Sequence, residues 1–178
     1  MQKYEKYYQR SSLKKIFYYG LGWLALISKI LPKKKGLYAF GSMNGYAVAD
    51  NSKYLFKNLE KNNTIFFITK NKEILKEEIS NGTFPIYAFS FKGILIQLFS
   101  EKVYFTHGIF DFIPPLIWGS EKHNLWHGVP SKEIGPDADW KFSSQLTKRL
   151  KILFFRLHGY MYYMSCDYVY CPFIERVN

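Results

Sequence analysis

The segment 125–135, LWHGVPSKEIG, combines residue types that can hold an anion and move a proton. His127 lies between Trp126 and Gly128, and Lys132 follows five residues later with no acidic residue between them. An imidazole can accept a proton near neutral pH, and a lysine ammonium pairs with an anionic group. Glycine lets the backbone come close to a ligand, which a histidine buried in a core would not require.

We therefore predict that His127 is a catalytic proton acceptor and that its neighbours contact a substrate. Pro130 stiffens the loop, and a helix that begins after it would add backbone N–H donors for an anion. The alternative is a structural histidine that is bonded within the fold. The predicted substrate contacts of this segment are Trp126, Gly128, Pro130 and Lys132.

Two further loops carry polar residues that could meet a ligand. His107, in the sequence Thr-His-Gly, has two equally supported interpretations, a substrate contact and a loop histidine bonded to the backbone. The loop GSMNG, residues 41–45, lacks the G-x-G-x-x-G and Walker patterns, so a tight turn is favoured over a phosphate site. Its predicted substrate contacts are Gly41, Ser42 and Asn44.

The other candidate residues are assigned to the fold. His123 starts a predicted strand and His158 lies in an apolar helical segment, so both are predicted to be structural, and Asp50 and Asn51 are predicted to serve a helix start. No metal-ligand spacing is present, so no cofactor or metal site is predicted, and metal dependence stays open.

The two cysteines favour a reducing compartment. Cys166 and Cys171 are five residues apart on a predicted strand and would point to opposite faces. A disulfide between them is therefore not expected, which fits the cytosol.

Strand and helix patterns alternate along the chain after Gly36. Short apolar runs predict strands, and helical segments of about ten residues separate them. This order predicts right-handed β-α-β crossovers and an α/β, Rossmann-like, mainly parallel sheet with flanking helices. The predicted strands cover 37–40, 64–69, 84–90, 102–107, 123–127 and 167–171, and the predicted helices cover 50–61, 71–80, 91–100 and 146–165.

Three candidate loops follow predicted strands. They are 41–45, 106–108 and 126–128. Because ligands of open parallel sheets bind beyond the carboxyl ends of the strands, we expect these loops to lie at one edge of the sheet.

Residues 1–35 are predicted to be a basic arm that precedes a domain of residues 36–178. The arm holds nine Lys or Arg against Glu5 and carries +8, whereas the other 143 residues carry only +3. A nucleic-acid-binding domain would carry its basic residues on the folded face, so nucleic acid is not a predicted partner.

The uncharged run 16–28 of the arm is bracketed by lysines. A helix of this length spans about 20 Å, less than the ~30 Å hydrocarbon core of a bilayer. Its spacing is typical of an amphipathic helix that lies in the membrane interface near anionic lipids and that Pro32 ends, the alternative being a helix packed on the domain. The predicted membrane residues are Lys14, Lys15, Phe17, Trp23, Leu24, Ile27, Lys33, Lys34 and Lys35.

Four segments together resemble the CDP-glycerol glycerophosphotransferase family, which makes teichoic acids and related capsular polymers of glycerol or ribitol phosphate. They are YAFGSMNGYAVADNSKYLFKNL, FFITKN, THGIFD and LWHGVPSKEIG, and the resemblance runs from about Leu37 to Cys171. The pattern Trp-His-Gly-x-Pro-x-Lys-x-x-Gly in the last segment is its most specific part.

The resemblance implies one half of a GT-B-type enzyme, the N-terminal domain that faces the acceptor, with a CDP-alcohol bound by a second domain. It implies that His127 is the general base that deprotonates the acceptor hydroxyl, with CMP leaving, and that no cofactor is needed beyond the CDP-glycerol or similar donor substrate. It also implies a peripheral enzyme at the cytoplasmic face of the cell membrane, acting on a lipid-linked glycan acceptor.

The chain reaches Asn178 about where the resemblance would place the donor-binding domain. We therefore expect a fragment or a truncated form, with little transferase activity from the isolated chain. The alternative function is a non-catalytic membrane-associated module that binds an anionic lipid-linked glycan or a partner protein.

Overall fold

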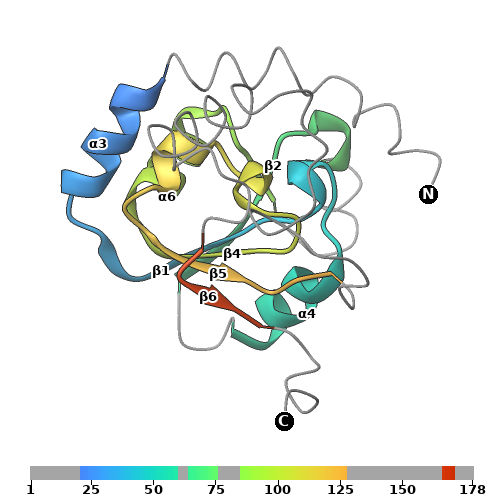
Figure 1. Ribbon diagram of the computed structural model, residues 1–178. Helices are drawn as coiled ribbons and strands as arrows, with labels where there is room; N and C mark the ends of the chain where they lie inside the picture. The colour runs from blue at the N-terminus through green and yellow to red at the C-terminus, as the bar shows by residue number, and fades with distance from the viewer. Residues whose placement is uncertain (1–20, 60–63, 76–84, 128–165, 171–178) are drawn as a thin grey trace, which may run out of the picture.

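The computed structural model describes residues 21–59, 64–75, 85–127 and 166–170, which form a parallel sheet flanked by helices (Figure 1). The described strand pairs are all parallel, and the six strands follow the order β3-β2-β1-β4-β5-β6. The predicted α/β, Rossmann-like architecture is therefore confirmed. The strands are β1 (Lys34–Phe40), β2 (Thr64–Thr69), β3 (Ile86–Tyr87), β4 (Ser100–Phe105), β5 (Glu121–Asn124) and β6 (Tyr168–Val169).

The strand order creates a switch point between β1 and β4. From β1 the chain moves outward to β2 and β3, then returns to β4 on the other side of β1 and continues to β5 and β6. The loops after β1 and β4 therefore leave the sheet in opposite directions, which opens a crevice at the carboxyl edge.

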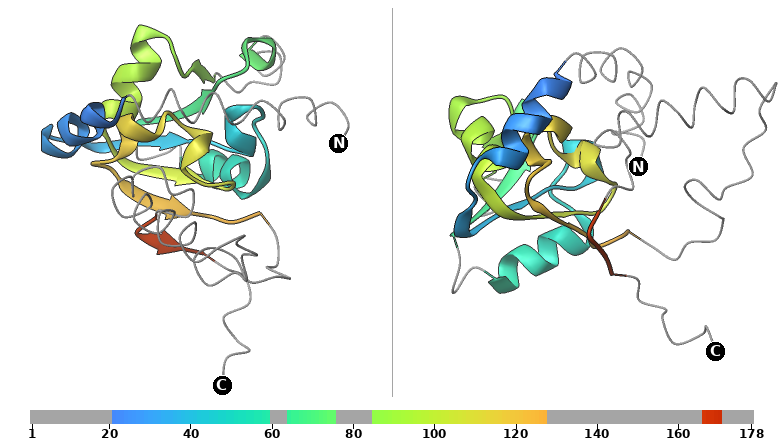
Figure 2. Two further views of the ribbon diagram at one scale, coloured as in Figure 1. Left: turned by 45° about the horizontal axis from the view of Figure 1, so that its top comes forward. Right: turned by 60° about the vertical axis from the view of Figure 1, so that its left-hand side comes forward.

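Helices cover both faces of the sheet (Figure 2). Helices α3 and α6 lie on one face together with the turn η3, and α4 lies on the other. The described helices are α3 (Gly22–Ile30), α4 (Asp50–Leu59) and α6 (Phe91–Phe99), and the 3-10 turns are η1 (Met43–Gly45), η2 (Ile109–Asp111) and η3 (Pro114–Ile117).

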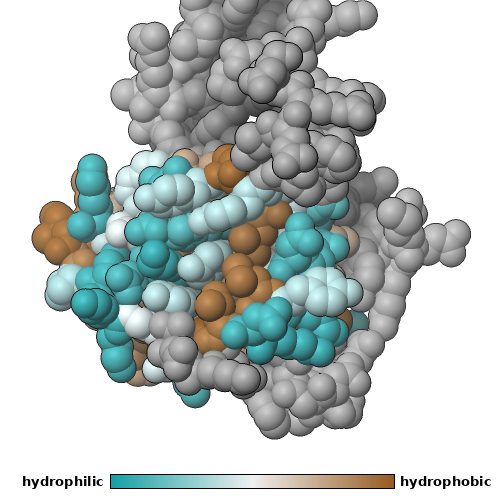
Figure 3. All heavy atoms as spheres, turned by 90° about the horizontal axis from the view of Figure 1, so that it is seen from below, coloured by the Kyte–Doolittle hydropathy of each residue, from teal (hydrophilic) through white to brown (hydrophobic). Residues whose placement is uncertain are grey.

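Alternation along the strands divides the core into two clusters. In β4, Phe105 packs with the α3 and α6 side, whereas Tyr104 packs with the α4 side. On the α4 side, the rings of Phe40 and Tyr104 stack with their centroids 4.8 Å apart, and Phe56 of α4 meets Phe40 edge-on. Figure 3 looks onto the molecule from this lower side, where a strip of hydrophobic residues is visible between hydrophilic ones.

Strands β4 and β5 end two and three residues earlier than the predicted ends at 107 and 127. After β4, the N–H of Thr106 donates to a carboxylate of Asp111 instead of to the sheet. After β5, the N–H of Trp126 donates to the side chain of Asn124, and Trp126 has a positive φ of 54°. His107 and His127, which were predicted to end strands, therefore lie in the loops that follow β4 and β5.

The helices agree with the predictions over the described residues. The predicted cap of the third helix is present, because the Ser90 hydroxyl accepts a hydrogen bond from the N–H of Gly93. The segment predicted as a helix over 71–80 is helical at 72–75, and the helix predicted over 146–165 lies outside the described residues. Helix α3 ends at Ile30, just before Pro32, as expected. None of the helices in the described part of the chain is long and apolar enough to cross a membrane.

Candidate functional site

The carboxylate of Asp111 organises the carboxyl edge of the sheet. One oxygen accepts the N–H of Asn44 at 2.6 Å, and the other accepts the N–H groups of Thr106 at 2.9 Å and His107 at 3.2 Å. Asp111 is fully buried, and burial raises its pKa to about 6 although the backbone donors oppose the shift. One buried side chain thus ties the loop after β1 to the loop after β4.

The loop 41–45 is the tight turn that was favoured for it. The Ser42 hydroxyl is fully buried, donates to the carbonyl of Ala47 at 2.7 Å and accepts from the N–H of Ala49 at 3.0 Å. Gly41 is required by close packing, since a Cβ there would come within 2.8 Å of the Cβ of Asp111. The structure therefore places Gly41 and Ser42 where they shape the edge, and their contact with substrate stays a prediction.

Three aromatic rings stack where the loops after β4 and β5 meet. The ring of His107 lies 4.0 Å from that of His127 at an angle of 17°, and the Trp126 ring lies 5.2 Å from that of His127 at 8°. Trp126 is buried and His127 is exposed. The structure thus brings together His107 and His127, which the sequence placed at one edge, and leaves His127 facing outward.

Asn51 fixes the loop that carries His127. Its side-chain amide donates to the carbonyls of Leu125 and Trp126, each at 3.0 Å. The prediction that Asn51 serves the helix start is wrong, because the side chain reaches across to the loop after β5 instead. Nothing in the local sequence distinguishes this role from a cap.

Asp50 begins α4, as predicted, and its side chain also lies beside the histidines, which the sequence did not predict. Its Oδ2 is 3.7 Å from Nδ1 of His107, and Asp50 adopts a positive φ of 56° at the first residue of α4. Coulombic interaction with His127 also acts on its carboxyl group. The sequence could not reveal this contact, since the residues are brought together only by the crossover between β1 and β4.

Burial and mutual contact set the charges of this cluster. Burial, and to a lesser degree the nearby His127, lower the pKa of His107 to about 4. His107 is therefore neutral at pH 7. Burial raises the pKa of Asp50, while His127 and Thr106 oppose the shift.

His123 occupies a different setting on strand β5. Its Nε2 lies 2.6 Å from Oε1 of Glu121 as an ion-pair contact without good hydrogen-bond alignment, and its Nδ1 lies 3.0 Å from the Tyr170 hydroxyl. Its ring stacks on Tyr104 and Tyr168 with centroids 4.7 Å and 4.9 Å away. The predicted structural role of His123 agrees with this packing.

Several predicted site residues cannot be placed. Gly128, Pro130 and Lys132 lie outside the described residues, as do His158 and Cys171, so the disulfide prediction also stays open. No group of three His, Cys, Asp or Glu side chains within residues 21–59, 64–75, 85–127 and 166–170 could hold a metal ion.

Most of the large apolar side chains of α3 point away from the domain, whereas the partly buried Leu24 packs against the core. Ala25 and Ser28 are buried, and the Ser28 hydroxyl donates to the carbonyl of Leu116 at 2.6 Å. By contrast, Trp23 is 58% exposed, Leu26 is 65% exposed and Ile30 is 82% exposed. The helix therefore packs on the domain through Leu24, Ala25 and Ser28, and its binding to a membrane interface stays a prediction.

The predicted membrane residues Leu24 and Lys33 face inward instead, because Lys33 Nζ donates to the Ser28 hydroxyl at 3.2 Å and to the carbonyl of Leu98 at 2.6 Å. The residues Lys14, Lys15 and Phe17 lie outside the described residues.

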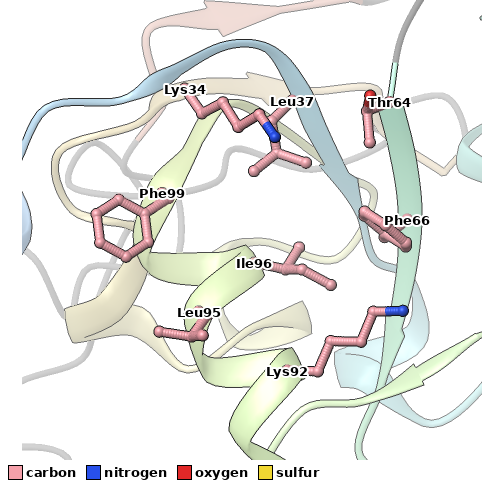
Figure 4. A pocket seen from close by; sticks show the side chains of 8 residues that line it. All are labelled: Lys34, Leu37, Thr64, Phe66, Lys92, Leu95, Ile96 and Phe99. Carbon is pink, nitrogen blue, oxygen red and sulfur yellow. The ribbon is translucent and has the colours of Figure 1, made fainter.

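A shallow cavity of about 360 Å³ opens near the start of β1 and β2 (Figure 4). Lys34 begins β1 and Thr64 begins β2, whereas the histidines follow the carboxyl ends of β4 and β5. The cavity is lined mainly by apolar side chains of the sheet and of α6, with Lys34 and Lys92 among them. It therefore belongs to the opposite edge from the candidate site.

The parallel sheet with a switch point and a histidine cluster beyond its carboxyl edge defines a Rossmann-like α/β domain. The chain belongs to the CDP-Glycerol:Poly(glycerophosphate) glycerophosphotransferase family, whose model matches residues 24–175. This is a family of transferases, as the sequence motifs implied.

Two solved structures of the wall teichoic acid polymerase TagF share the fold. Both are of a single-residue histidine variant, one of them soaked with CDPG for 30 minutes, and each has a TM-score of 0.53 at 15% identity. The matches cover 93% and 90% of this chain but 42% and 40% of the TagF chains. The chain thus spans about two fifths of the length of the proteins that it resembles. No curated protein matches the sequence significantly.

Proposed function

We propose that the chain is the acceptor-side half of an enzyme that transfers glycerol phosphate, or a related polyol phosphate, from a CDP-alcohol to a lipid-linked acceptor in teichoic acid or capsule synthesis. The observation that carries the proposal is the stack of His127 on His107 and Trp126 at the switch point of the sheet. An exposed imidazole on a fixed loop can meet an incoming hydroxyl, whereas a buried one cannot.

His127 is the general base in this proposal. It takes the proton of the acceptor hydroxyl, the acceptor oxygen forms a bond to the donor phosphorus next to the alcohol, and the bond to CMP breaks. The buried Trp126 fixes the plane of the ring, and Asn51 holds the two carbonyls that precede it. Holding the base in place supplies the orientation on which phosphoryl transfer largely depends.

Transfer is proposed to need contacts beyond these 178 residues. The family match covers most of the chain, while the chain covers only 42% of the first TagF chain. The assay therefore uses the complete enzyme, and the isolated chain is expected to release little CMP.

The test compares CMP release from CDP-glycerol by the wild type and by the His127→Ala and His123→Gln variants. Removal of a general base lowers the rate by about 10²- to 10⁴-fold, so His127→Ala should lose nearly all turnover. His123→Gln should keep most of it, since His123 lies on β5 away from the stack. Near-normal turnover by a folded His127→Ala enzyme would sink the assignment.

We also propose that the domain binds a membrane surface through the exposed side of α3, as a peripheral protein at the cytoplasmic face. Exposed Trp23, Leu26 and Ile30 offer apolar area to the interface, and Lys34 and Lys35 follow the helix at exposed positions near anionic lipids.

Flotation with vesicles of mixed anionic and neutral phospholipid tests this surface. Replacing exposed Leu26 and Ile30 together by Gln should reduce the bound fraction several-fold, because each buried apolar side chain contributes about 1.5–3 kcal/mol. Tyr54→Gln is the matched control, since Tyr54 is 72% exposed on α4, on the other face of the sheet. Equal flotation of the α3 variant and the control would argue against the surface.

The same two assays separate the transferase from the alternative, a non-catalytic membrane-associated module. A non-catalytic module would bind vesicles through α3 but would release no CMP, so His127→Ala would change neither of the two measurements. The position of His127, exposed and stacked at the switch point, favours the transferase.

A further inference from the structure

Among the described residues, two carboxylates approach the histidine stack, and they differ in what they bind. Asp111, from η2, uses its oxygens on the backbone N–H groups of Asn44, Thr106 and His107. Asp50, from the start of α4, has its Oδ2 buried without a well-formed hydrogen bond and 3.7 Å from Nδ1 of His107. Thr106 and His107 lie near this carboxylate, but Oδ2 has no hydrogen bond of good geometry. An incompletely bonded buried oxygen is costly, so its position calls for a function.

The backbone holds Asp50 in place against a local preference. Its φ of 56° lies in the left-handed region, which costs a residue other than glycine about 1–2 kcal/mol. The next residue, Asn51, binds the carbonyls of Leu125 and Trp126. At the start of α4, Asn51 thus holds the loop that carries His127, and Asp50 directs its carboxylate toward the histidine rings.

Within the described part of the stack, His107 does not share a positive charge with His127 near neutral pH. His107 is neutral at pH 7, because burial and, to a lesser degree, the proximity of His127 lower its pKa to about 4. A proton that enters the stack near neutral pH therefore leaves a cation against a neutral, half-buried ring. Such a cation is stabilised by an opposite charge within a few ångströms.

We propose that Asp50 is a positioning residue whose carboxylate is the counter-ion of the imidazolium that forms on His127 during transfer. This inference rests on the proposed function. As the acceptor oxygen bonds to phosphorus and CMP leaves, the acceptor proton moves to His127, and Asp50 keeps its negative charge without taking that proton. The carboxylate acts through the ring and does not touch the reacting atoms.

The test follows the ring protons of the four histidines by NMR in the chain of 178 residues as pH is lowered. Asp50→Asn removes the charge, keeps the size and tolerates a positive φ. The first protonation step of the His107–His127 stack, which belongs to the two rings together, should move down by about one pH unit. Proton binding is then roughly tenfold weaker, a change that a merely structural role for Asp50 would not produce.

Glu121→Gln is the matched control, because Glu121 contacts only His123 among the described histidines. It should shift the titration of His123 and leave the stack unchanged. If Asp50→Asn leaves the first step of the stack in place while Glu121→Gln moves His123, the proposal is overturned. Asp50→Gly, which also suits the backbone, replaces Asp50→Asn if that variant does not fold.

In the complete enzyme, Asp50→Asn should lower kcat more than it changes KM and should move the acid limb of the pH–rate profile. The NMR experiment needs no substrate, so the two proposals can fail separately. Full activity of His127→Ala would overturn the proposed function, whereas an unchanged stack titration in Asp50→Asn would overturn only the role of Asp50.

Discussion

The described residues contain two histidine–carboxylate clusters, one on strand β5 and one in the loops that follow β4 and β5, and their surroundings differ. His123 on β5 contacts Glu121 at 2.6 Å, lies against the Tyr170 hydroxyl and stacks between tyrosine rings. His107 and His127 lie beyond the strands, with Asp50 at the looser distance of 3.7 Å. His123 is buried on a regular strand, whereas His127 is exposed beside strained backbone, so the second cluster is the one that a ligand can reach.

Backbone conformation makes the same distinction. The strand that carries His123 is regular and pairs with β4 and β6. The site, in contrast, uses positive φ values at Asp50 and Trp126, which only surrounding contacts can maintain. The structural histidine is therefore held by the sheet, and the candidate site is held by side chains of Asn51 and Asp111.

Removal of Asp111 should have the largest effect on this comparison. Asp111→Ala leaves three buried N–H groups without an acceptor, which should lower the free energy of unfolding by about 3 kcal/mol or more. Chemical denaturation monitored by circular dichroism measures the loss. The His107–His127 stack should loosen, while NMR signals of His123 stay in place in the folded fraction. Equal disturbance of both histidine regions would contradict the separation drawn between them.

The pH dependence of stability sharpens the contrast between the two carboxylates. Burial raises the pKa of Asp111 to about 6, so the folded state holds its proton more strongly than the unfolded state. Its contribution is fully present below about pH 4 and is lost as pH rises through 6.

The contribution of Glu121 to stability has the opposite pH dependence. Its pKa is lowered, because Lys102 and His123 outweigh the effect of burial, so its contribution is present above the usual pKa and is lost as pH falls. Denaturation of the wild type and of Glu121→Gln between about pH 2 and 8 measures these slopes. Asp111→Asn should remove the fall in the free energy of unfolding as pH rises toward 6. A fall that persists in that variant would contradict its assignment to Asp111.

Loss of the Asn51 amide should have a smaller and more local effect. Asn51→Ala removes two hydrogen bonds that hold the loop after β5, at about 1 kcal/mol each. Hydrogen exchange should become faster at residues 125–127 and stay unchanged in β1. Asn58→Ala is the matched control, because Asn58 bonds only within α4. Unchanged exchange in the loop would show that Asn51 does not hold it.

The sequence predicted the sheet and the place of the site but not the contacts that build it. Apolar runs and their spacing reveal strands, and loops that follow parallel strands must meet at one edge, so His107 and His127 could be brought together in advance. The roles of Asp50 and Asn51 could not, because a polar pair before a helix has the same pattern whether it caps the helix or reaches across a crevice. The sequence also did not reveal which side of α3 faces outward, because spacing alone does not show that Ala25 lies on the buried side.

Replacement of His127 should change the titration of its neighbour without unfolding the protein. His127 is the second cause, after burial, of the low pKa of His107, so His127→Gln should raise that pKa from about 4 toward its usual range. Burial remains, and the rise should therefore be partial. NMR titration of the His107 ring measures it, and an unchanged value would mean that the rings do not interact.

The smallest expected effect is that of Glu121→Gln on stability. Glu121 is more than one third exposed and pairs with both Lys102 at 3.1 Å and His123 at 2.6 Å, and solvent screens such pairs. The free energy of unfolding at pH 7 should fall by less than about 1 kcal/mol, as measured by denaturation. Lys57→Gln on the exposed side of α4 serves as a control for loss of a surface charge. If the free energy of unfolding instead fell by several kcal/mol, the Glu121–His123 pair would be central to the stability of the fold. The two histidine clusters would then differ in their contribution to stability as well as in exposure.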